Sequence, residues 1–456
     1  MTPYMKIKHR AKVHTSMKQA AWILFLSIMY LLRDLAKLPF PDIAFSGVAA
    51  VAFLFTDAGS AMGIYLFTSA LTVPDMEIRF AYLLVLLGKA YFQKKKLNVP
   101  VLLASMAMLT LELLDIGLFS ENSWFGAIYK CAERISYVVL PVFWLSENHS
   151  PTVYHRALLC YVAGVVLGGA TMLIISIGAV GWDGVLSGKL RLGMNTTQGY
   201  YNASSMHTGY NANQLASMYA ITVAIAFGMI RQKKIQPILG YMLVAFSALM
   251  VLLTQSRSGL LMLCLAGIVY LWYLIVREKK MLQASIALGV FIVIIIVLTF
   301  TFPGLWEGAL KRFINPGDHD ITGGRGDLFR EYIVAWFSNP WCILFGYGIE
   351  SYQYVVDSIN VPHNIITDIL ISWGLTGFFL LFYTWRIMLR YGTKKVMKKK
   401  RVLALLPAIV AAIYSMSGQY LSTAFPHMRL CFLLLAARAF SDEDLLTAKR
   451  SKRMLQ

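Results

Sequence analysis

Long apolar runs separated by short polar connections fill almost the whole chain. A full membrane crossing by a helix needs about 20 apolar residues, and several of the runs before Lys94 are shorter than that. The pattern therefore predicts an all-α, polytopic membrane protein with about 12–14 transmembrane helices. The fourteen runs lie near residues 20–32, 42–57, 60–73, 78–92, 99–119, 125–145, 157–181, 213–230, 236–254, 258–276, 281–302, 364–385, 402–420 and 427–440.

Basic residues gather in alternate connections between these runs. If the N-terminus is cytoplasmic and all fourteen runs cross, 28 of the 42 Lys and Arg residues fall on the cytoplasmic side, as the positive-inside rule expects. This predicts a cytoplasmic basic N-terminus at 1–19, transmembrane helices over 20–302 and 364–440, and a cytoplasmic tail at 441–456. The long connection 303–363, with four basic and seven acidic residues, falls outside.

The composition supports this class. The chain has 456 residues, of which 58% are hydrophobic and 14% charged, whereas about 25% of a soluble domain is charged. The net charge of +19 could indicate nucleic-acid binding, but clusters between apolar runs are typical of orientation signals, so we expect the lipid bilayer as partner and no nucleic acid. The five cysteines lack CxxC spacing, which indicates neither a zinc site nor a disulfide framework.

The connection 303–363 is the most polar stretch between apolar runs, and it predicts a surface helix on the membrane. The helix should end at Asn339-Pro340, Gly346 and Gly348 should form a tight turn, and Pro362 suits the start of the next helix. Its apolar stripe consists of Leu328, Phe329, Tyr332, Ile333, Trp336 and Phe337.

Arg257 lies between two strongly apolar helices with almost no loop between them. An arginine at the centre of a bilayer costs about 2.5–3.5 kcal/mol on insertion scales and tends to face a partner in a cavity. The alternative is an arginine that snorkels to the outer surface from the helix junction.

His363 and Asn364 begin an apolar run that also holds Asp368, Gly374 and Gly377. Asn364 and Asp368 are four residues apart and share a helix face, while the two glycines allow a neighbouring backbone to approach closely. With an unperturbed pKa of about 6.5, His363 could act as a general base. The spacing alone favours an interfacial or capping histidine.

Two further polar positions precede predicted helices. Asn213 lies directly before an apolar run, where the commonest role of asparagine is the N-cap. Arg325 is flanked by Gly324 and Gly326, so its guanidinium could approach a phosphate closely. A solvated loop arginine is the alternative for this position.

These motifs together resemble the O-antigen ligase and O-antigen polymerase family. His363-Asn364, nine residues, Gly374, two residues and Gly377 match the family's H-[NSQ]-x9-G-x-x-G pattern. Arg257 lies in a similar small-residue, Arg, Gly junction. The resemblance also includes Arg325 before the amphipathic run, the Gly346-x-Gly348 turn and Asn213 before a helix, and it covers about residues 205–385.

The resemblance implies a GT-C-like membrane glycosyltransferase without cofactor or metal. Its donor would be a glycan on undecaprenyl diphosphate, and its acceptor a sugar or lipid glycan outside the bacterial cytoplasmic membrane. His363, Arg257 and Arg325 would be catalytic, with the arginines stabilising charge on the diphosphate and His363 accepting or orienting the acceptor hydroxyl. The expected substrate-binding residues are Asn213, Asn364, Gly346, Gly348 and Arg330.

Two alternatives stay open from the sequence. The family contains polymerases and ligases, and the motifs do not separate them. A flippase of lipid-linked oligosaccharide, or another transporter, would also be polytopic with charged residues in the membrane. Many transporters carry an internal repeat, which this chain does not show, so a transferase is the preferred interpretation.

Overall fold

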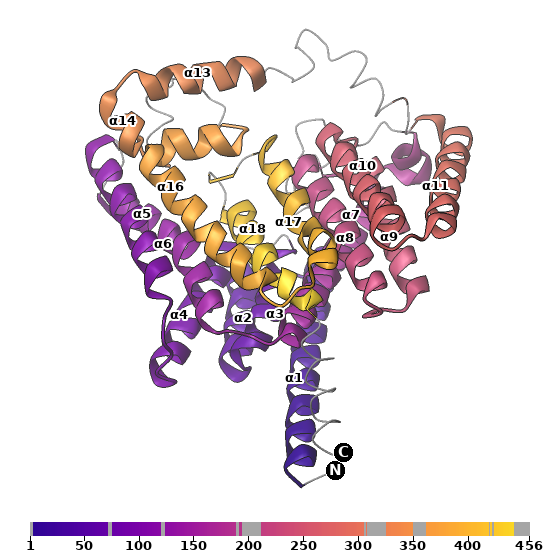
Figure 1. Cartoon of the computed structure of the whole chain (residues 1–456), viewed down its shortest axis with the longest axis horizontal. Helices are drawn as coiled ribbons and strands as arrows, with labels where there is room; N and C mark the ends of the chain where they lie inside the picture. The colour runs from indigo at the N-terminus through magenta and orange to yellow at the C-terminus, as the bar shows by residue number, and fades with distance from the viewer. Residues whose placement is uncertain are drawn as a thin grey trace.

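The computed structural model describes residues 3–71, 75–119, 124–187, 191–193, 211–304, 307, 325–349, 362–418, 420–421 and 424–441. Within these ranges the chain forms helices and no strands. The α-helices are α1 (Pro3–Asp34), α2 (Asp42–Phe55), α3 (Ala58–Ser69), α4 (Asp75–Phe92), α5 (Val99–Phe119), α6 (Trp124–Ser146), α7 (Pro151–Leu186), α8 (Ala212–Arg231), α9 (Pro237–Leu253), α10 (Arg257–Trp272), α11 (Met281–Thr301), α13 (Arg325–Phe337), α14 (Pro340–Phe345), α16 (Ile365–Thr393), α17 (Arg401–Ser415) and α18 (Ala424–Ala436). Short η segments follow α10, precede α17 and follow α18 (Figure 1).

The all-α, polytopic membrane class is confirmed. Five helices in the described ranges are long and apolar enough to cross a membrane. Each of the fourteen predicted apolar runs contains a helix, but several are shorter than a full crossing, so the figure of 12–14 transmembrane helices stays a prediction. The five long spans are Val99–Phe119, Pro151–Leu186, Ala212–Arg231, Arg257–Arg277 and Ile365–Thr393.

The N-terminal basic segment is part of the first helix. α1 starts at Pro3 and runs without a break to Asp34, because no glycine or further proline interrupts this stretch. At its far end Arg33 is buried, and its side chain pairs with Asp34 at 2.7 Å and with Asp42 at 3.0 Å. The N-terminal part of α1 extends beyond the bundle (Figure 1), whereas Gln19 is already buried within it.

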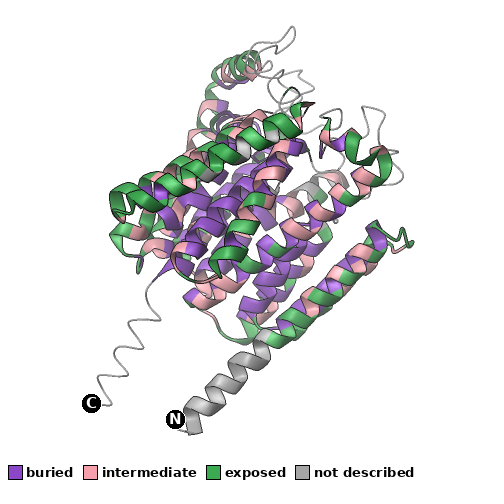
Figure 2. Ribbon diagram, turned by 90° about the vertical axis from the view of Figure 1, so that its right-hand side faces the viewer, coloured by how far each residue is buried: buried purple, intermediate pink, exposed green. Residues whose placement is uncertain are grey.

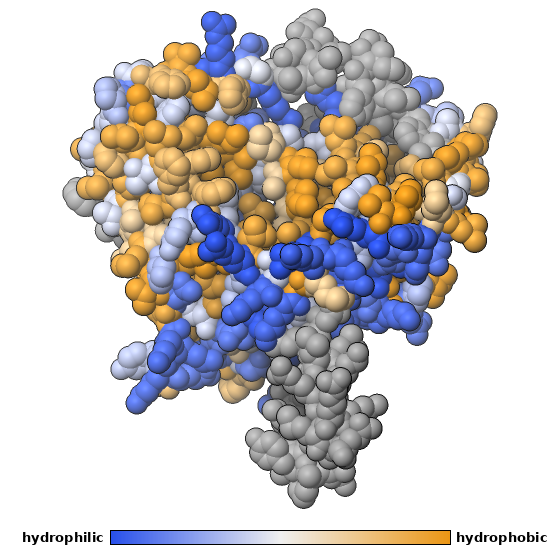
Figure 3. All heavy atoms as spheres, viewed as in Figure 1, coloured by the Kyte–Doolittle hydropathy of each residue, from blue (hydrophilic) through white to orange (hydrophobic). Residues whose placement is uncertain are grey.

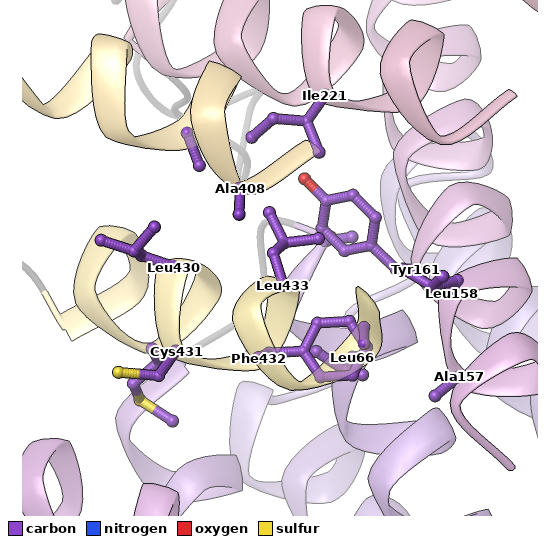
Figure 4. Packing of buried hydrophobic residues seen from close by; sticks show 14 of the residues in the cluster. Leu66, Ala157, Leu158, Tyr161, Ile221, Ala408, Leu430, Cys431, Phe432 and Leu433 are labelled. Carbon is purple, nitrogen blue, oxygen red and sulfur yellow. The ribbon is translucent and has the colours of Figure 1, made fainter. Parts of the chain in front are cut away.

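The middle of the bundle is one continuous apolar core. α18 contributes Leu430 to Leu433, which lie among Leu66 of α3, Tyr161 of α7 and Ala408 of α17 (Figure 4). Exposed residues occupy the outward faces of the outer helices, and buried residues face inward (Figure 2). Large apolar side chains such as Phe55, Leu103 and Leu282 are among the exposed residues, which is the surface that a lipid environment requires.

Contacts between the connections sort them into two sets, one at each end of the bundle. At one end Lys95 pairs with Glu147 at 3.1 Å, and Arg231 pairs with Glu278. Hydrophilic side chains gather along this lower part of the molecule, below an apolar band (Figure 3). The connections that meet here are those predicted to be basic and cytoplasmic.

The second set lies at the opposite end, with α13 and α14 (Figure 1). The backbone N–H of Leu192 donates to the carbonyl oxygen of Leu253 at 3.0 Å, and the side chain of Asn364 donates to the carbonyl oxygen of Met416 at 3.3 Å. These connections are the ones predicted to lie outside. The contacts agree with the predicted sorting, while the assignment of one end to the cytoplasm stays a prediction.

Cysteine labelling can test that assignment. In a variant without native cysteines, Ser338→Cys after α13 should react with a membrane-impermeant maleimide in intact cells. Met397→Cys, in the basic connection after α16, should react only after the cells are opened, because both positions are exposed but lie at opposite ends. Labelling of both positions in intact cells would contradict the two-sided arrangement.

Candidate functional site

α16 consists of two segments that meet at Gly374. The backbone of Gly374 has φ 61° and ψ −161°, so the helix breaks and changes direction there (Figure 1). A glycine is required because a side chain is strained at positive φ, and a Cβ would also lie 2.4 Å from backbone atoms of Leu344 and Phe345. The short first segment, from Ile365 to Trp373, thereby packs closely against α14.

The turn after α14 makes the opposite half of this contact. Gly346 and Gly348 both have positive φ, 82° and 84°, as the predicted tight turn requires. The N–H groups of Tyr347 and Gly348 donate to the carbonyl oxygens of Ile371 and Ser372, each at 2.8 Å. The two glycines therefore let the turn pack directly against the backbone of α16. This is a structural role, in addition to the predicted role in substrate binding.

The surface helix is anchored on the first segment of α16. Tyr332 and Trp336 of α13 are buried in a small core with Tyr347, Leu370 and Ile371. Four of the six residues in the predicted stripe contact this core, whereas Phe329 and Phe337 are exposed. The helix ends at Phe337, and Asn339 caps α14 by accepting a hydrogen bond from the N–H of Trp341 at 2.9 Å.

Arg325, at the start of α13, is within electrostatic range of His363, which lies just before α16. The pKa of His363 is lowered from its ordinary value of 6.5, first by burial and second by the positive charge of Arg325. No group in the described ranges hydrogen-bonds the buried Nδ1 of His363. The N-cap of α16 is Asn364, which accepts from the N–H of Ile366 at 2.8 Å, so the capping interpretation of His363 is wrong.

A second polar group lies where α8 and α10 begin. The amide oxygen of Asn213 accepts hydrogen bonds from Arg191 at 3.0 Å and from Ser256 at 2.8 Å. The predicted N-cap role of Asn213 is wrong, because Asn211 caps α8 and bonds the N–H of Asn213 at 2.9 Å. Being two residues into the helix, Asn213 is free to use its side chain toward α10.

Arg257 is the first residue of α10 and follows directly after this group. Ser256 is the N-cap of α10 and accepts from the N–H of Gly259 at 3.2 Å. A Cβ at Gly259 would lie 2.5 Å from the Cβ of Ala216 on α8, so the small residue lets the two helices meet closely. The Ser-Arg-Ser-Gly junction therefore fixes the backbone position of Arg257.

The end of α17 lies between the two polar groups. Asn364 donates to the carbonyl oxygen of Met416, and Asp368 accepts from the N–H groups of Tyr420 and Leu421 at 3.1 and 2.6 Å. Asn364 and Asp368 therefore share a face, as predicted. The Tyr414 hydroxyl of α17 is within electrostatic range of both Arg325 and Arg429.

Arg429 of α18 is a residue of this region that the motifs do not include. Its side chain is buried, with 3% exposure, and it donates to the Ser217 hydroxyl of α8 at 2.9 Å. The guanidinium also lies beside the hydroxyl of Tyr161, which points toward Ile221 of α8 (Figure 4). An arginine inside the apolar run 427–440 was the available signal.

Glu112 of α5 is a second residue that the motifs do not include. Its carboxylate is fully buried and accepts from the N–H of Ile349 at 3.1 Å and from the indole N–H of Trp373 at 2.7 Å. It therefore ties the turn after α14 and the break in α16 to α5. A glutamate in the apolar run 99–119 was the signal here.

The structure does not bring every predicted residue into this arrangement. Arg330 is exposed on α13, and no contact in the described ranges links it to His363 or Arg257. No group of three or more His, Cys, Asp or Glu side chains that could hold a metal occurs in the described part of the chain. The expectation of metal-free transfer stays a prediction.

The order of Arg257, Arg325, the Gly346 turn and His363-Asn364, together with their common end of the bundle, agrees with a known family. Residues 242–382 match the family model described as O-antigen ligase. The chain carries an O-antigen ligase domain, so the resemblance drawn from the motifs is confirmed for this part. Comparison with functionally characterised proteins gives no match.

The O-antigen ligase domain covers most of the predicted site. All the predicted catalytic residues and all the predicted substrate-binding residues except Asn213 lie in 242–382. The match falls inside the predicted region 205–385. Asn213, Arg429 and Glu112 come from helices outside the matched residues, and the domain indicates glycan transfer in polysaccharide biosynthesis as the general function.

Proposed function

We propose that the protein transfers a glycan from undecaprenyl diphosphate to an acceptor hydroxyl, at the extracytoplasmic face of a bacterial cytoplasmic membrane. The observation that carries this proposal is that Arg325 is within electrostatic range of His363, with both residues inside the O-antigen ligase domain. The reaction needs a cation and a weak base. The guanidinium of Arg325 binds the leaving phosphate, and the imidazole of His363 accepts a proton.

The two arginines of the domain bind the diphosphate leaving group. In the reaction the bond between the anomeric carbon and the diphosphate oxygen breaks, and undecaprenyl diphosphate leaves with the electron pair. Fixed guanidinium groups stabilise charge that develops on this oxygen, because they need no reorganisation during the step. Arg325 is the first residue of α13 and Arg257 the first residue of α10, so a helix fixes the backbone position of each.

His363 accepts the proton of the acceptor hydroxyl. The acceptor oxygen forms the new bond to the anomeric carbon, and its proton passes to the imidazole. Burial and the charge of Arg325 lower the pKa of His363, which keeps the ring neutral and able to accept a proton at neutral pH. Asn364 fixes the position of His363 by capping the next helix.

The transporter alternative has no observation in its favour. An O-antigen ligase domain indicates glycan transfer, and the predicted catalytic residues lie at one end of the bundle rather than along a path through it. Whether the acceptor is a second lipid-linked glycan or a different glycan is tested by supplying purified donor with and without an added lipid-glycan acceptor. Lengthened donor in the reaction without added acceptor would identify a polymerase.

Substitution of lysine for each catalytic arginine tests the role of the guanidinium. Arg325→Lys and Arg257→Lys should each lower glycan transfer at least about tenfold, because lysine keeps the charge but loses the planar pair of donors that matches a phosphate. The measurement is transfer from purified undecaprenyl-diphosphate glycan in detergent or nanodiscs. Arg390→Lys, at an exposed position near the end of α16, is the matched control and should keep wild-type activity.

A result in which both lysine variants transfer glycan at the wild-type rate would contradict bidentate phosphate binding. Loss of activity in proportion to loss of folded protein would contradict it as well. Size-exclusion chromatography of each variant separates this case from a catalytic defect.

A further inference from the structure

A cavity of about 400 Å³ lies at the end of the bundle opposite to His363. Three lysines and one arginine line it: Lys96 before α5, Lys394 and Lys395 after α16, and Arg438 after α18. Asn98, Ser146, Asn148 and Tyr391 are the other polar residues of the lining. We call this cavity the basic pocket.

Arg438 is held in a fixed position at the basic pocket. The side chain has 8% exposure, and its guanidinium lies 4.7 Å from the centre of the Tyr391 ring. The amide oxygen of Asn148 accepts from Arg438 at 3.2 Å and from the Tyr391 hydroxyl at 2.6 Å. Such an arrangement orients the planar guanidinium before any ligand arrives.

The walls of the basic pocket are also tied together. The N–H of Asn98 donates to the Ser146 hydroxyl at 2.9 Å, and Lys95 pairs with Glu147 at 3.1 Å. These contacts hold the connection before α5 against the end of α6. The rim lysines Lys96, Lys394 and Lys395 are exposed, so they extend from a rigid frame toward solvent.

We infer that the basic pocket binds a phosphate group, carried by an anionic lipid headgroup or by a soluble phosphate compound. Four cationic residues line the cavity, and no carboxylate occurs among the described residues that do so. A fixed guanidinium with exposed lysines around it matches phosphate geometry and charge. The volume is in the usual range of about 300–1,000 Å³ for small-molecule sites.

General attraction between basic connections and a membrane does not explain this arrangement. Lys398 and Lys399 belong to the same connection as Lys394 and Lys395 and are also exposed, but they do not line the pocket. The basic pocket differs because a buried arginine, an aromatic ring and an asparagine converge behind its lysines. It lies away from the donor site proposed above, so its occupation is a separate binding event.

The test compares two double variants with equal loss of charge. Lys394→Gln/Lys395→Gln removes two charges from the basic pocket, and Lys398→Gln/Lys399→Gln removes two from the same connection outside it. Short-chain phosphatidylglycerol, short-chain phosphatidylcholine and inorganic diphosphate are titrated separately into the full-length protein in neutral detergent, and binding is followed by thermal shift. Arg438→Lys is the third variant, because it keeps the charge while losing the stacked plane.

The wild-type protein should bind an anionic probe in preference to phosphatidylcholine. The pocket double variant should bind that probe more weakly, by about fivefold for each removed charge, while the control double variant stays near wild type. Arg438→Lys should also weaken binding at unchanged net charge. Preference for phosphatidylglycerol identifies a lipid headgroup as the source of the phosphate, and preference for diphosphate identifies a soluble compound.

Two results would overturn the inference. Equal weakening in both double variants would show that only total charge matters. Binding that appears only after Asp442→Asn, Glu443→Gln and Asp444→Asn are combined would show that the acidic segment following Ser441 is the occupant of the pocket. Failure of glycan transfer in any assay would leave the result unchanged, because binding is measured directly.

Discussion

Replacement of His363 by alanine is expected to lower glycan transfer about 10²–10⁴-fold, the usual loss when a general base is removed. The amount of folded protein should stay close to wild type, because His363 is only half-buried and Asn364 supplies the helix cap. The rate is measured with purified undecaprenyl-diphosphate glycan as donor. Thermal unfolding of the same preparation provides the stability.

Asn364→Ala is the matched comparison for the neighbouring position. It removes the cap and should lower stability by about 0.5–2 kcal/mol, so its apparent melting temperature should fall more than that of His363→Ala. If His363→Ala retains transfer within a few-fold of wild type, His363 is not the base. A melting temperature that falls further in His363→Ala than in Asn364→Ala would instead indicate a structural role.

The pH dependence of transfer provides an independent measure of His363. A base works in its neutral form, so the rate should decline as pH falls through the pKa of His363, which lies below 6.5. Arg325 contributes to this lowering, so Arg325→Gln should raise the pKa and move the acid limb to higher pH. If the acid limb stays at the same pH in Arg325→Gln, Arg325 does not lower the pKa of the group that limits the rate.

The second large effect is expected at the contact between the Gly346 turn and α16. Gly346→Ala should lower the free energy of unfolding by about 2–5 kcal/mol, as the sum of positive-φ strain and overpacking. The new Cβ would lie 2.3 Å from the carbonyl oxygen of Ser372, and that backbone cannot move without breaking the hydrogen bonds to Tyr347 and Gly348. Apparent melting temperature and yield of monodisperse protein measure the effect.

Gly267→Ala in α10 is the control for this substitution. A Cβ at Gly267 would meet no atom within 4 Å, and the residue has ordinary helical φ. Alanine there should leave stability unchanged or raise it by about 0.5–1 kcal/mol, because helical glycine has a higher entropy cost. Equal melting temperatures of the Gly346 and Gly267 variants would refute the packing argument.

Local patterns predicted the helices and the turn well. Each apolar run became helical, and positive φ at Gly346 and Gly348 followed from the need for a tight turn. Gly374 forms the predicted close backbone contact. Gly377 does not, because the space next to it is taken by Trp373 of its own helix. A spacing of three residues places two glycines on similar faces, but the break at Gly374 separates their surroundings.

Side-chain partners that come from distant helices could not be predicted in the same way. Ser217 and Arg429 are separated by 212 residues, and Glu112 and Trp373 by 261. Each signal was visible as a charge in an apolar run, but the sequence alone does not say which polar group faces that charge. The capping role of Asn213 was wrong for a related reason, since Asn211 and Asn213 both suit a helix start and only the contact with α10 distinguishes them.

The support that Asp368 and Glu112 give to α16 limits how far the O-antigen ligase domain can be treated as a module. Asp368 is bonded by the backbone at Tyr420 and Leu421, and Trp373 donates to Glu112 of α5. All three partners lie outside residues 242–382. A chimera that transplants only those residues into another membrane scaffold would lose both supports of the helix segment that follows His363. Exchange of specificity between relatives therefore calls for grafting α5 and the connection between α17 and α18 along with the domain.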